Sequence, residues 1–122
     1  MSKILVVDDS SFMRLMLKDI LRAKHEIADE GTNGQEAVEK YKKLKPDLVT
    51  IDMIMPVQNG IDAVKEIVKF DPAAKVIMVS AMGQELLVEE AMQSGAKAFI
   101  VKPFQGEKVL ETVDRVLKET KK

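Results

Sequence analysis

The sequence predicts a doubly wound α/β fold in which a five-stranded parallel sheet is covered by five helices. Short apolar runs alternate with longer segments whose apolar residues recur every three or four positions, and this strand–helix alternation occurs five times. The short runs are apolar at consecutive positions, which is typical of parallel strands buried on both faces. Because connections between parallel strands are right-handed crossovers, we expect helices on both sides of the sheet.

Five runs are expected to form the strands. The first contains Ile4 to Val7, which is too short for a helix and rich in β-branched residues. The second contains only two apolar residues, Ile27 and Ala28. In chain order, the predicted strands are residues 3–7, 26–29, 48–51, 76–79 and 98–101.

The helices are predicted from apolar stripes and from residues that begin or end helices. Asn59-Gly60 often marks a hairpin, but the apolar residues that follow it have helical spacing, so we expect a helix entry there. Gly95 suits the position just past a helix C-terminus. Five helices are predicted. The first begins at the polar residues 8–11 and ends at about residue 22, and the third begins at residue 61 and ends at Asp71-Pro72. The second, fourth and fifth cover residues 35–43, 84–94 and 107–118.

Composition favours one globular domain and excludes several function classes. The 122 residues suit a single compact domain, 1–122, without an output domain. A formal net charge of -1 gives no electrostatic basis for binding nucleic acid or an anionic membrane. The absence of cysteine excludes disulfides and thiol catalysis, and no apolar run approaches the roughly 18 residues of a membrane span. Met1-Ser2-Lys3 does not open a signal peptide, so we expect a cytoplasmic protein.

Polar residues end four of the predicted strands. Asp8 and Asp9 follow the first strand, Asp52 the third, Ser80 the fourth and Lys102 the fifth. A charge beside a buried strand needs a reason, because an unpaired buried charge is costly. In a doubly wound sheet, ligands bind beyond the carboxyl ends of the strands. We therefore expect these strand ends to converge on one site in which Asp52 is the reactive group.

Three carboxylates brought together would repel one another, by about 4 kcal/mol for two unit charges about 4 Å apart at an effective dielectric of about 20. Such a cluster needs a cation, and oxygen ligands without histidine or cysteine point to Mg²⁺. Lys102 and Ser80 suit phosphoryl oxygens, and an aspartate can attack phosphorus to give an aspartyl-phosphate. Simpler interpretations stay open: Asp8 and Asp9 could cap a helix, and Ser80 and Lys102 could lie in turns.

Four motifs are spread over the chain: Val6-Val7-Asp8-Asp9, Asp52 with Met55-Pro56 and Gly60, Ser80-Ala81, and Lys102-Pro103-Phe104. On these motifs the chain resembles the receiver domains of response regulators over essentially its whole length. Ser11-Phe12-Met13-Arg14 and the lack of an output domain make it most similar to the single-domain chemotaxis regulators. The resemblance implies a flavodoxin-like sheet with strand order 2-1-3-4-5.

The resemblance also implies a role for each residue that would meet the phosphoryl group. Asp52 would accept this group from a histidine kinase, and Ser80 and Lys102 would contact it. The Lys102–Pro103 bond would be cis. Phe99 would be the switch aromatic, which turns inward when Ser80 moves towards the phosphate.

A magnesium site is implied in the same way. Asp9 and Asp52 would ligate Mg²⁺ directly, Asp8 would act through water, and the backbone carbonyl of Ile54 would complete the protein ligands. Ile54 and Met82 are apolar, whereas family members often carry polar residues at one or both positions, which influence access of the hydrolytic water to the phosphoryl group. The resemblance therefore does not predict the rate of self-dephosphorylation. The chain would be a phosphoacceptor switch rather than an enzyme, with self-phosphorylation from small phosphodonors.

The expected partners are a histidine kinase of the chemotaxis type and a flagellar switch protein, a phosphatase or both. They would bind a monomer at the face formed by helix 84–94, strand 98–101 and the last helix. A stand-alone receiver in a non-chemotaxis phosphorelay is the main alternative. A flavodoxin-like electron carrier is a more remote alternative. It would need a phosphate-binding loop at the position of Asp8-Asp9, and aromatic residues to stack on the flavin, whereas this chain has one tyrosine and no tryptophan. A haloacid-dehalogenase phosphatase would need a second acid at position 54, which is Ile54 here. A pseudo-receiver that is not phosphorylated is disfavoured, because the complete set of acids, serine and lysine is present.

Overall fold

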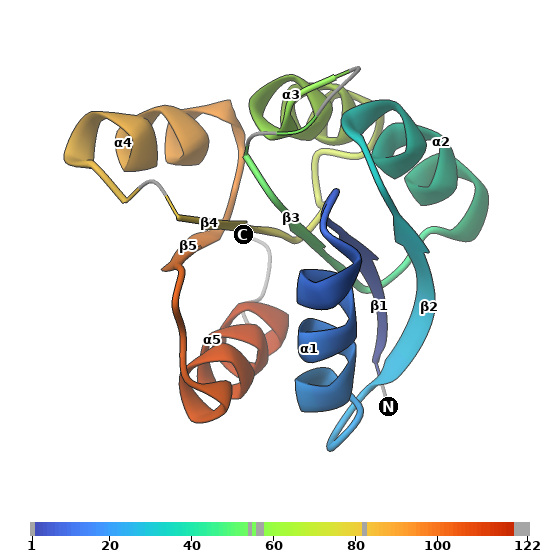
Figure 1. The fold of residues 1–122 in the computed structure, drawn as a ribbon. Coiled ribbons are helices and arrows are strands. Elements are labelled where there is room, and N and C mark those ends of the chain that lie inside the picture. The colour runs from blue at the N-terminus through green and yellow to red at the C-terminus, as the bar shows by residue number, and fades with distance from the viewer. Residues whose placement is uncertain (1, 54, 56–57, 82, 119–122) are drawn as a thin grey trace.

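Five parallel strands alternate with five helices across the part of the chain that this computed structural model describes, residues 2–53, 55, 58–81 and 83–118 (Figure 1). The strands are β1 (Lys3–Val7), β2 (Glu26–Gly31), β3 (Leu48–Ile51), β4 (Val76–Ser80) and β5 (Ala98–Val101). The helices are α1 (Ser11–Leu21), α2 (Gly34–Leu44), α3 (Gly60–Phe70), α4 (Glu85–Ser94) and α5 (Gly106–Lys118). The sheet order is β2-β1-β3-β4-β5, as the resemblance implies.

Helices α2, α3 and α4 cover one face of the sheet, and α1 and α5 cover the other (Figure 1). Alternate residues of β1 therefore enter different cores. Leu5 and Val7 pack on the α2–α4 side, whereas Ile4 and Val6 pack with α1 and α5. All four side chains are at most 1% exposed. Burial on both faces explains why the strands are apolar at consecutive positions.

β2 differs most from its prediction. It runs two residues beyond the expected end at Asp29 and stops at Gly31, at the edge of the sheet beside β1. Glu30 and Gly31 do not indicate this extension in the sequence, because charged residues are uncommon in buried strands and glycine is depleted in strands. At a sheet edge, such side chains can reach solvent and oppositely charged partners.

The helix starts lie where the sequence signals predict. Asn33 and Asn59 cap α2 and α3, each accepting a 2.9 Å hydrogen bond from a backbone N–H in the first turn. Asn59-Gly60 thus begins a helix rather than a hairpin. Gly60 leaves no room for a side chain, since a Cβ there would lie 2.1 Å from the backbone oxygen of Asp52. The start of α3 is therefore packed directly against the residue that follows β3.

None of the helices in the described ranges combines the length and the apolar character needed to cross a bilayer.

Candidate functional site

The structure brings the predicted strand-end residues to one edge of the sheet. Asp8 follows β1, Asp52 follows β3, Ser80 ends β4 and Lys102 follows β5. One carboxylate oxygen from each of Asp8, Asp9 and Asp52 lies within 4.8 Å of the other two. Asp8, Asp52 and Ser80 are buried, whereas Asp9 is exposed. The strand ends therefore meet, as the sequence predicts.

Lys102 connects the end of β5 to the carboxylates. Its Nζ donates a 2.9 Å hydrogen bond to Oδ2 of Asp8 and lies 3.6 Å from Oδ2 of Asp52. The lysine side chain is only 15% exposed, so this contact is shielded from solvent. One lysine against three carboxylates leaves two formal negative charges, which suits a divalent cation.

Asp8 is held at every polar atom that it carries. Its N–H donates to the carbonyl oxygen of Gly31 at 3.0 Å, which continues the pairing of β1 with β2. Its Oδ1 accepts a 2.9 Å hydrogen bond from the N–H of Ser10, and its Oδ2 accepts the bond from Lys102. Its own carbonyl oxygen accepts a 2.7 Å hydrogen bond from Nη1 of Arg14. Asp8 is therefore a fixed carboxylate that is 1% exposed.

The pairing of β4 with β5 places Ser80 next to Lys102. Ser80 is opposite Val101 in the ladder, and the N–H of Lys102 donates to the carbonyl oxygen of Ser80 at 2.8 Å. Ser80 is 1% exposed. The serine and the lysine thus come from neighbouring strands at the same edge of the sheet.

Four further residues named from the sequence, Pro103, Phe99, Ile54 and Met82, have different outcomes. The Lys102–Pro103 peptide bond is cis, as the resemblance implies. Phe99 lies opposite Met78 of β4 and is partly buried against the core cluster on the α2–α4 side. Ile54, the expected backbone ligand, lies outside the described residues, as does Met82.

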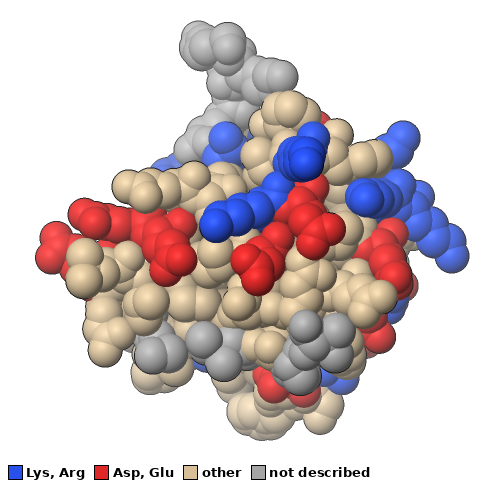
Figure 2. Space-filling model, turned by 90° about the horizontal axis from the view of Figure 1, so that it is seen from above, with Lys and Arg blue, Asp and Glu red and all other residues tan. Residues whose placement is uncertain are grey.

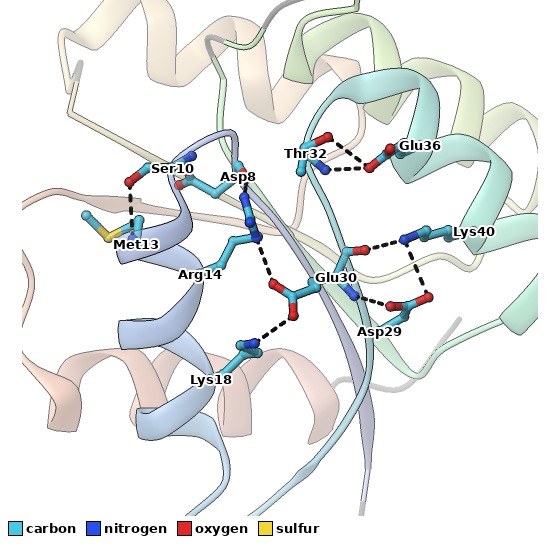
Figure 3. A network of polar contacts seen from close by, with 10 residues as sticks. All are labelled: Asp8, Ser10, Met13, Arg14, Lys18, Asp29, Glu30, Thr32, Glu36 and Lys40. Carbon is cyan, nitrogen blue, oxygen red and sulfur yellow. Dashed lines mark hydrogen bonds and ion pairs between the residues drawn. The ribbon is translucent and has the colours of Figure 1, made fainter.

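A polar network beside the site was not predicted (Figure 3). Nε of Arg14 donates to Oε1 of Glu30 at 2.7 Å, and Nζ of Lys18 donates to Oε2 at 2.6 Å. These two cations hold the pKa of the Glu30 carboxyl below its usual range, with the Lys18 hydrogen bond as the larger cause. The spacing of Arg14 and Lys18, one helical turn apart, indicates a shared face, but the sequence does not show that β2 runs beside it.

The donor set fits a magnesium ion. Carboxylate oxygens are the hard ligands that Mg²⁺ prefers, and an exposed Asp9 leaves room for the waters that this ion keeps. Asp8, Asp9 and Asp52 are the residues that could hold it.

The face that carries α2, α3 and α4 is unevenly charged (Figure 2). Acidic side chains gather at the end of this face where α4 lies, and the three charged residues of α4 are all acidic: Glu85, Glu89 and Glu90. Leu86 of α4 is 78% exposed and Val101 of β5 is 45% exposed. The face expected to bind partners, formed by α4, β5 and α5, therefore carries exposed apolar side chains next to the acidic residues of α4.

Comparison with known proteins identifies relatives along almost the whole chain. Residues 4–114 match the family model of the response regulator receiver domain. The chain is 61% identical over 117 residues to the chemotaxis protein CheY of Thermotoga maritima, a match covering 95% of this chain and 98% of the relative. It is also 55% identical over 118 residues to a Bacillus subtilis protein named CcdB, covering 96% of this chain and 98% of the relative.

A solved structure shows the same fold. A chain in the crystal structure of the CheX–CheY–BeF3–Mg²⁺ complex from Borrelia burgdorferi superposes with a TM-score of 0.93 and 42% identity. The match covers 97% of this chain and 90% of that one. Because both the family match and the superposition span the carboxylate cluster and all five strands, the chain belongs to the response regulator receiver domains, as a CheY-like member of two-component signalling.

Proposed function

We propose that the chain is a phosphorylation-dependent switch, and that Asp52 accepts a phosphoryl group from a histidine kinase of the chemotaxis type. The observation that carries this proposal is the meeting of three carboxylates with Lys102 at the carboxyl edge of the sheet. Of the two buried carboxylates, Asp52 is the better acceptor. The side chain of Asp52 is 11% exposed, whereas that of Asp8 is 1% exposed, so Asp52 is the more accessible of the two to an incoming phosphoryl group.

Phosphoryl transfer to Asp52 needs charge neutralisation more than proton transfer. An oxygen of Asp52 forms the new bond to phosphorus while the P–N bond of the phosphohistidine breaks, and its electron pair returns to the imidazole nitrogen. Lys102, already 3.6 Å from Asp52, would pair with one phosphoryl oxygen. The hydroxyl of Ser80 would donate a hydrogen bond to another.

The metal would be held by this chain's own oxygens. Asp9 and Asp52 would ligate Mg²⁺ directly, Asp8 would act through a water, and Ile54 would contribute its backbone carbonyl. When bound, Mg²⁺ would neutralise the charge of the transferring phosphoryl group. A site with two excess negative charges supports this assignment, because without a cation it would repel the incoming phosphate.

The phosphorylated state would be read at the face formed by α4, β5 and α5. Movement of Ser80 towards the phosphoryl group would let Phe99 turn inward and change this face. In the Borrelia structure, a related CheY is in complex with CheX. By similarity, a phosphatase or a flagellar switch protein would bind the monomer here.

Intact mass spectrometry tests the proposal. Incubation with acetyl phosphate and Mg²⁺ should add about 80 Da, as expected for one aspartyl-phosphate. The gain should be absent in EDTA and in the Asp52→Asn variant. A gain of equal size in Asp52→Asn would show that another residue is the acceptor, and no gain in the wild-type protein despite bound Mg²⁺ would refute phosphoryl transfer.

A receiver in a non-chemotaxis phosphorelay is the second candidate function. A relative at 55% identity has a name, CcdB, that does not refer to chemotaxis, whereas the relative at 61% identity is a chemotaxis protein. Phosphotransfer from each purified, autophosphorylated kinase of the source organism separates the two candidates. Fastest transfer from the chemotaxis kinase supports the first candidate, and fastest transfer from another kinase supports the second.

A further inference from the structure

Arg14 links the first loop of the site to the edge strand (Figure 3). Its guanidinium uses two different donors: Nη1 bonds to the carbonyl oxygen of Asp8 at 2.7 Å, and Nε bonds to Oε1 of Glu30 at 2.7 Å. The arginine side chain is 15% exposed and Asp8 is 1% exposed, so the bond to Asp8 is shielded from water, whereas the bond to Glu30, which is 38% exposed, is partly open to solvent. A planar guanidinium can serve two acceptors in fixed directions, whereas a lysine ammonium cannot span both in the same way.

Glu30 is itself held from several directions. Nζ of Lys18 lies 2.6 Å from Oε2 of Glu30, and the backbone oxygen of Glu30 accepts a hydrogen bond from Lys40. Lys40 also lies 3.5 Å from a carboxylate oxygen of Asp29. The anchor for Arg14 is therefore connected to α1, β2 and α2, and it does not depend on a single flexible side chain.

The carbonyl that Arg14 holds belongs to the peptide between Asp8 and Asp9. Fixing this carbonyl fixes the peptide plane, because the bond is planar, and so restricts where the Cα–Cβ bond of Asp9 can point. Asp9 is exposed, and within the described ranges no side chain or backbone N–H donates a hydrogen bond to its carboxylate. Its direction therefore depends mainly on the backbone.

We infer that Arg14, anchored by Glu30, is a positioning residue that presets Asp9 for Mg²⁺. This inference rests on the proposed metal site and adds to it a residue that does not touch the ion. Partners that orient ligands from outside the coordination sphere commonly change metal affinity by about tenfold or more when they are replaced.

The sign of the effect separates positioning from simple electrostatics. The positive charge of Arg14 opposes a nearby cation, so removing the charge alone would tighten Mg²⁺ binding. Loss of positioning would weaken binding. Arg14→Gln should therefore bind Mg²⁺ about tenfold more weakly, and Arg14→Lys should also bind it more weakly although its charge is unchanged.

Titration calorimetry with Mg²⁺ alone, on the full chain, measures this directly. Arg22→Gln and Arg22→Lys are matched controls, because Arg22 follows the same helix, is 55% exposed and pairs only with Asp19 at 3.8 Å among the described residues. Their Mg²⁺ affinity should equal that of the wild-type protein. Ile67→Val, at a buried position of α3, tests whether a general loss of stability alters Mg²⁺ affinity.

A double-mutant cycle shows whether Arg14 acts through Glu30. Glu30→Gln alone should weaken Mg²⁺ binding, and Arg14→Gln with Glu30→Gln should be little weaker than either single variant. Circular dichroism confirms that each variant is folded, and Glu30→Gln keeps the test usable should Arg14→Gln fail to fold.

The outcomes distinguish this inference from the proposed function. If the wild-type protein binds Mg²⁺ and the Arg14 variants bind it equally or more tightly, the positioning role is refuted and the metal site stands. If the wild-type protein binds no Mg²⁺ at millimolar concentration, the proposed function fails and this inference fails with it.

Discussion

Replacement of Lys102 by methionine should destabilise the protein in the absence of Mg²⁺. Its Nζ lies 2.9 Å from Asp8 and 3.6 Å from Asp52, which corresponds to attractions of about 6 and about 5 kcal/mol at an effective dielectric of about 20. Much of this attraction offsets the desolvation of the buried charges, so breaking such a pair typically costs about 3 kcal/mol. Methionine keeps the length of the apolar stem and removes only the charge.

Urea unfolding followed by circular dichroism in EDTA measures this loss. With a slope of about 1.5 kcal/mol per molar urea, a loss of about 3 kcal/mol lowers the midpoint by about 2 M. Mg²⁺ should stabilise the Lys102→Met variant more than the wild-type protein, because the lysine no longer repels the ion. Lys108→Met, at an exposed lysine of α5, is the control and should leave the midpoint unchanged.

Two results would refute this reasoning. The first is a Lys102→Met midpoint in EDTA equal to that of the wild-type protein, which would mean that the buried carboxylates do not need the lysine. The second is equal stabilisation of both proteins by Mg²⁺, which would mean that lysine and metal do not share the same carboxylates.

Three other sites give predictions of stability. Gly60→Ala should lose at least about 2 kcal/mol in urea unfolding, because its Cβ would lie 2.1 Å from the backbone oxygen of Asp52. Tyr41→Phe should lose about 1 kcal/mol with the 2.8 Å hydrogen bond to Asp71. Burial and Asp71 raise the pKa of Tyr41, so its absorbance should titrate at higher pH than free tyrosine, and the wild-type protein should lose stability as pH rises above about 10. The pKa of the Glu30 carboxyl is lower in the folded protein than its unfolded value of 4.5, so ionised Glu30 adds to the free energy of unfolding above that pH. The stability difference between wild type and Glu30→Gln should therefore shrink as pH falls below 4.5.

Each of these predictions has a control or a contradicting result. Gly31→Ala should be tolerated better than Gly60→Ala, because the nearest atom to its Cβ would lie 3.5 Å away. Tyr41 is the only tyrosine, so a titration at the pH of free tyrosine would contradict its burial without ambiguity. A stability difference for Glu30→Gln that is as large at pH 3 as at pH 7 would mean that the ion pairs are not its cause.

The sequence by itself determined the fold class, most of the element boundaries and the residues that end four strands. Leu48 to Ile51 is a short run before a carboxylate that is apolar except for Thr50, and Asn59-Gly60 marks the start of a helix. These features depend on residues within a few positions of one another, because strand burial, helix periodicity and capping are local in the chain. The strand order came from family resemblance, since the alternation of elements does not specify which strands are neighbours.

Only the tertiary structure decided how distant residues combine. The pair Lys102–Asp8 joins residues 94 positions apart, and Arg14–Glu30 joins residues 16 positions apart. The sequence also did not predict that β2 extends to Gly31. Glu30 is charged, and it fits in this strand because β2 lies at the edge of the sheet. Such contacts form because the whole sheet fixes where each strand ends, and packing across the sheet, rather than any local pattern, sets the distances between the side chains.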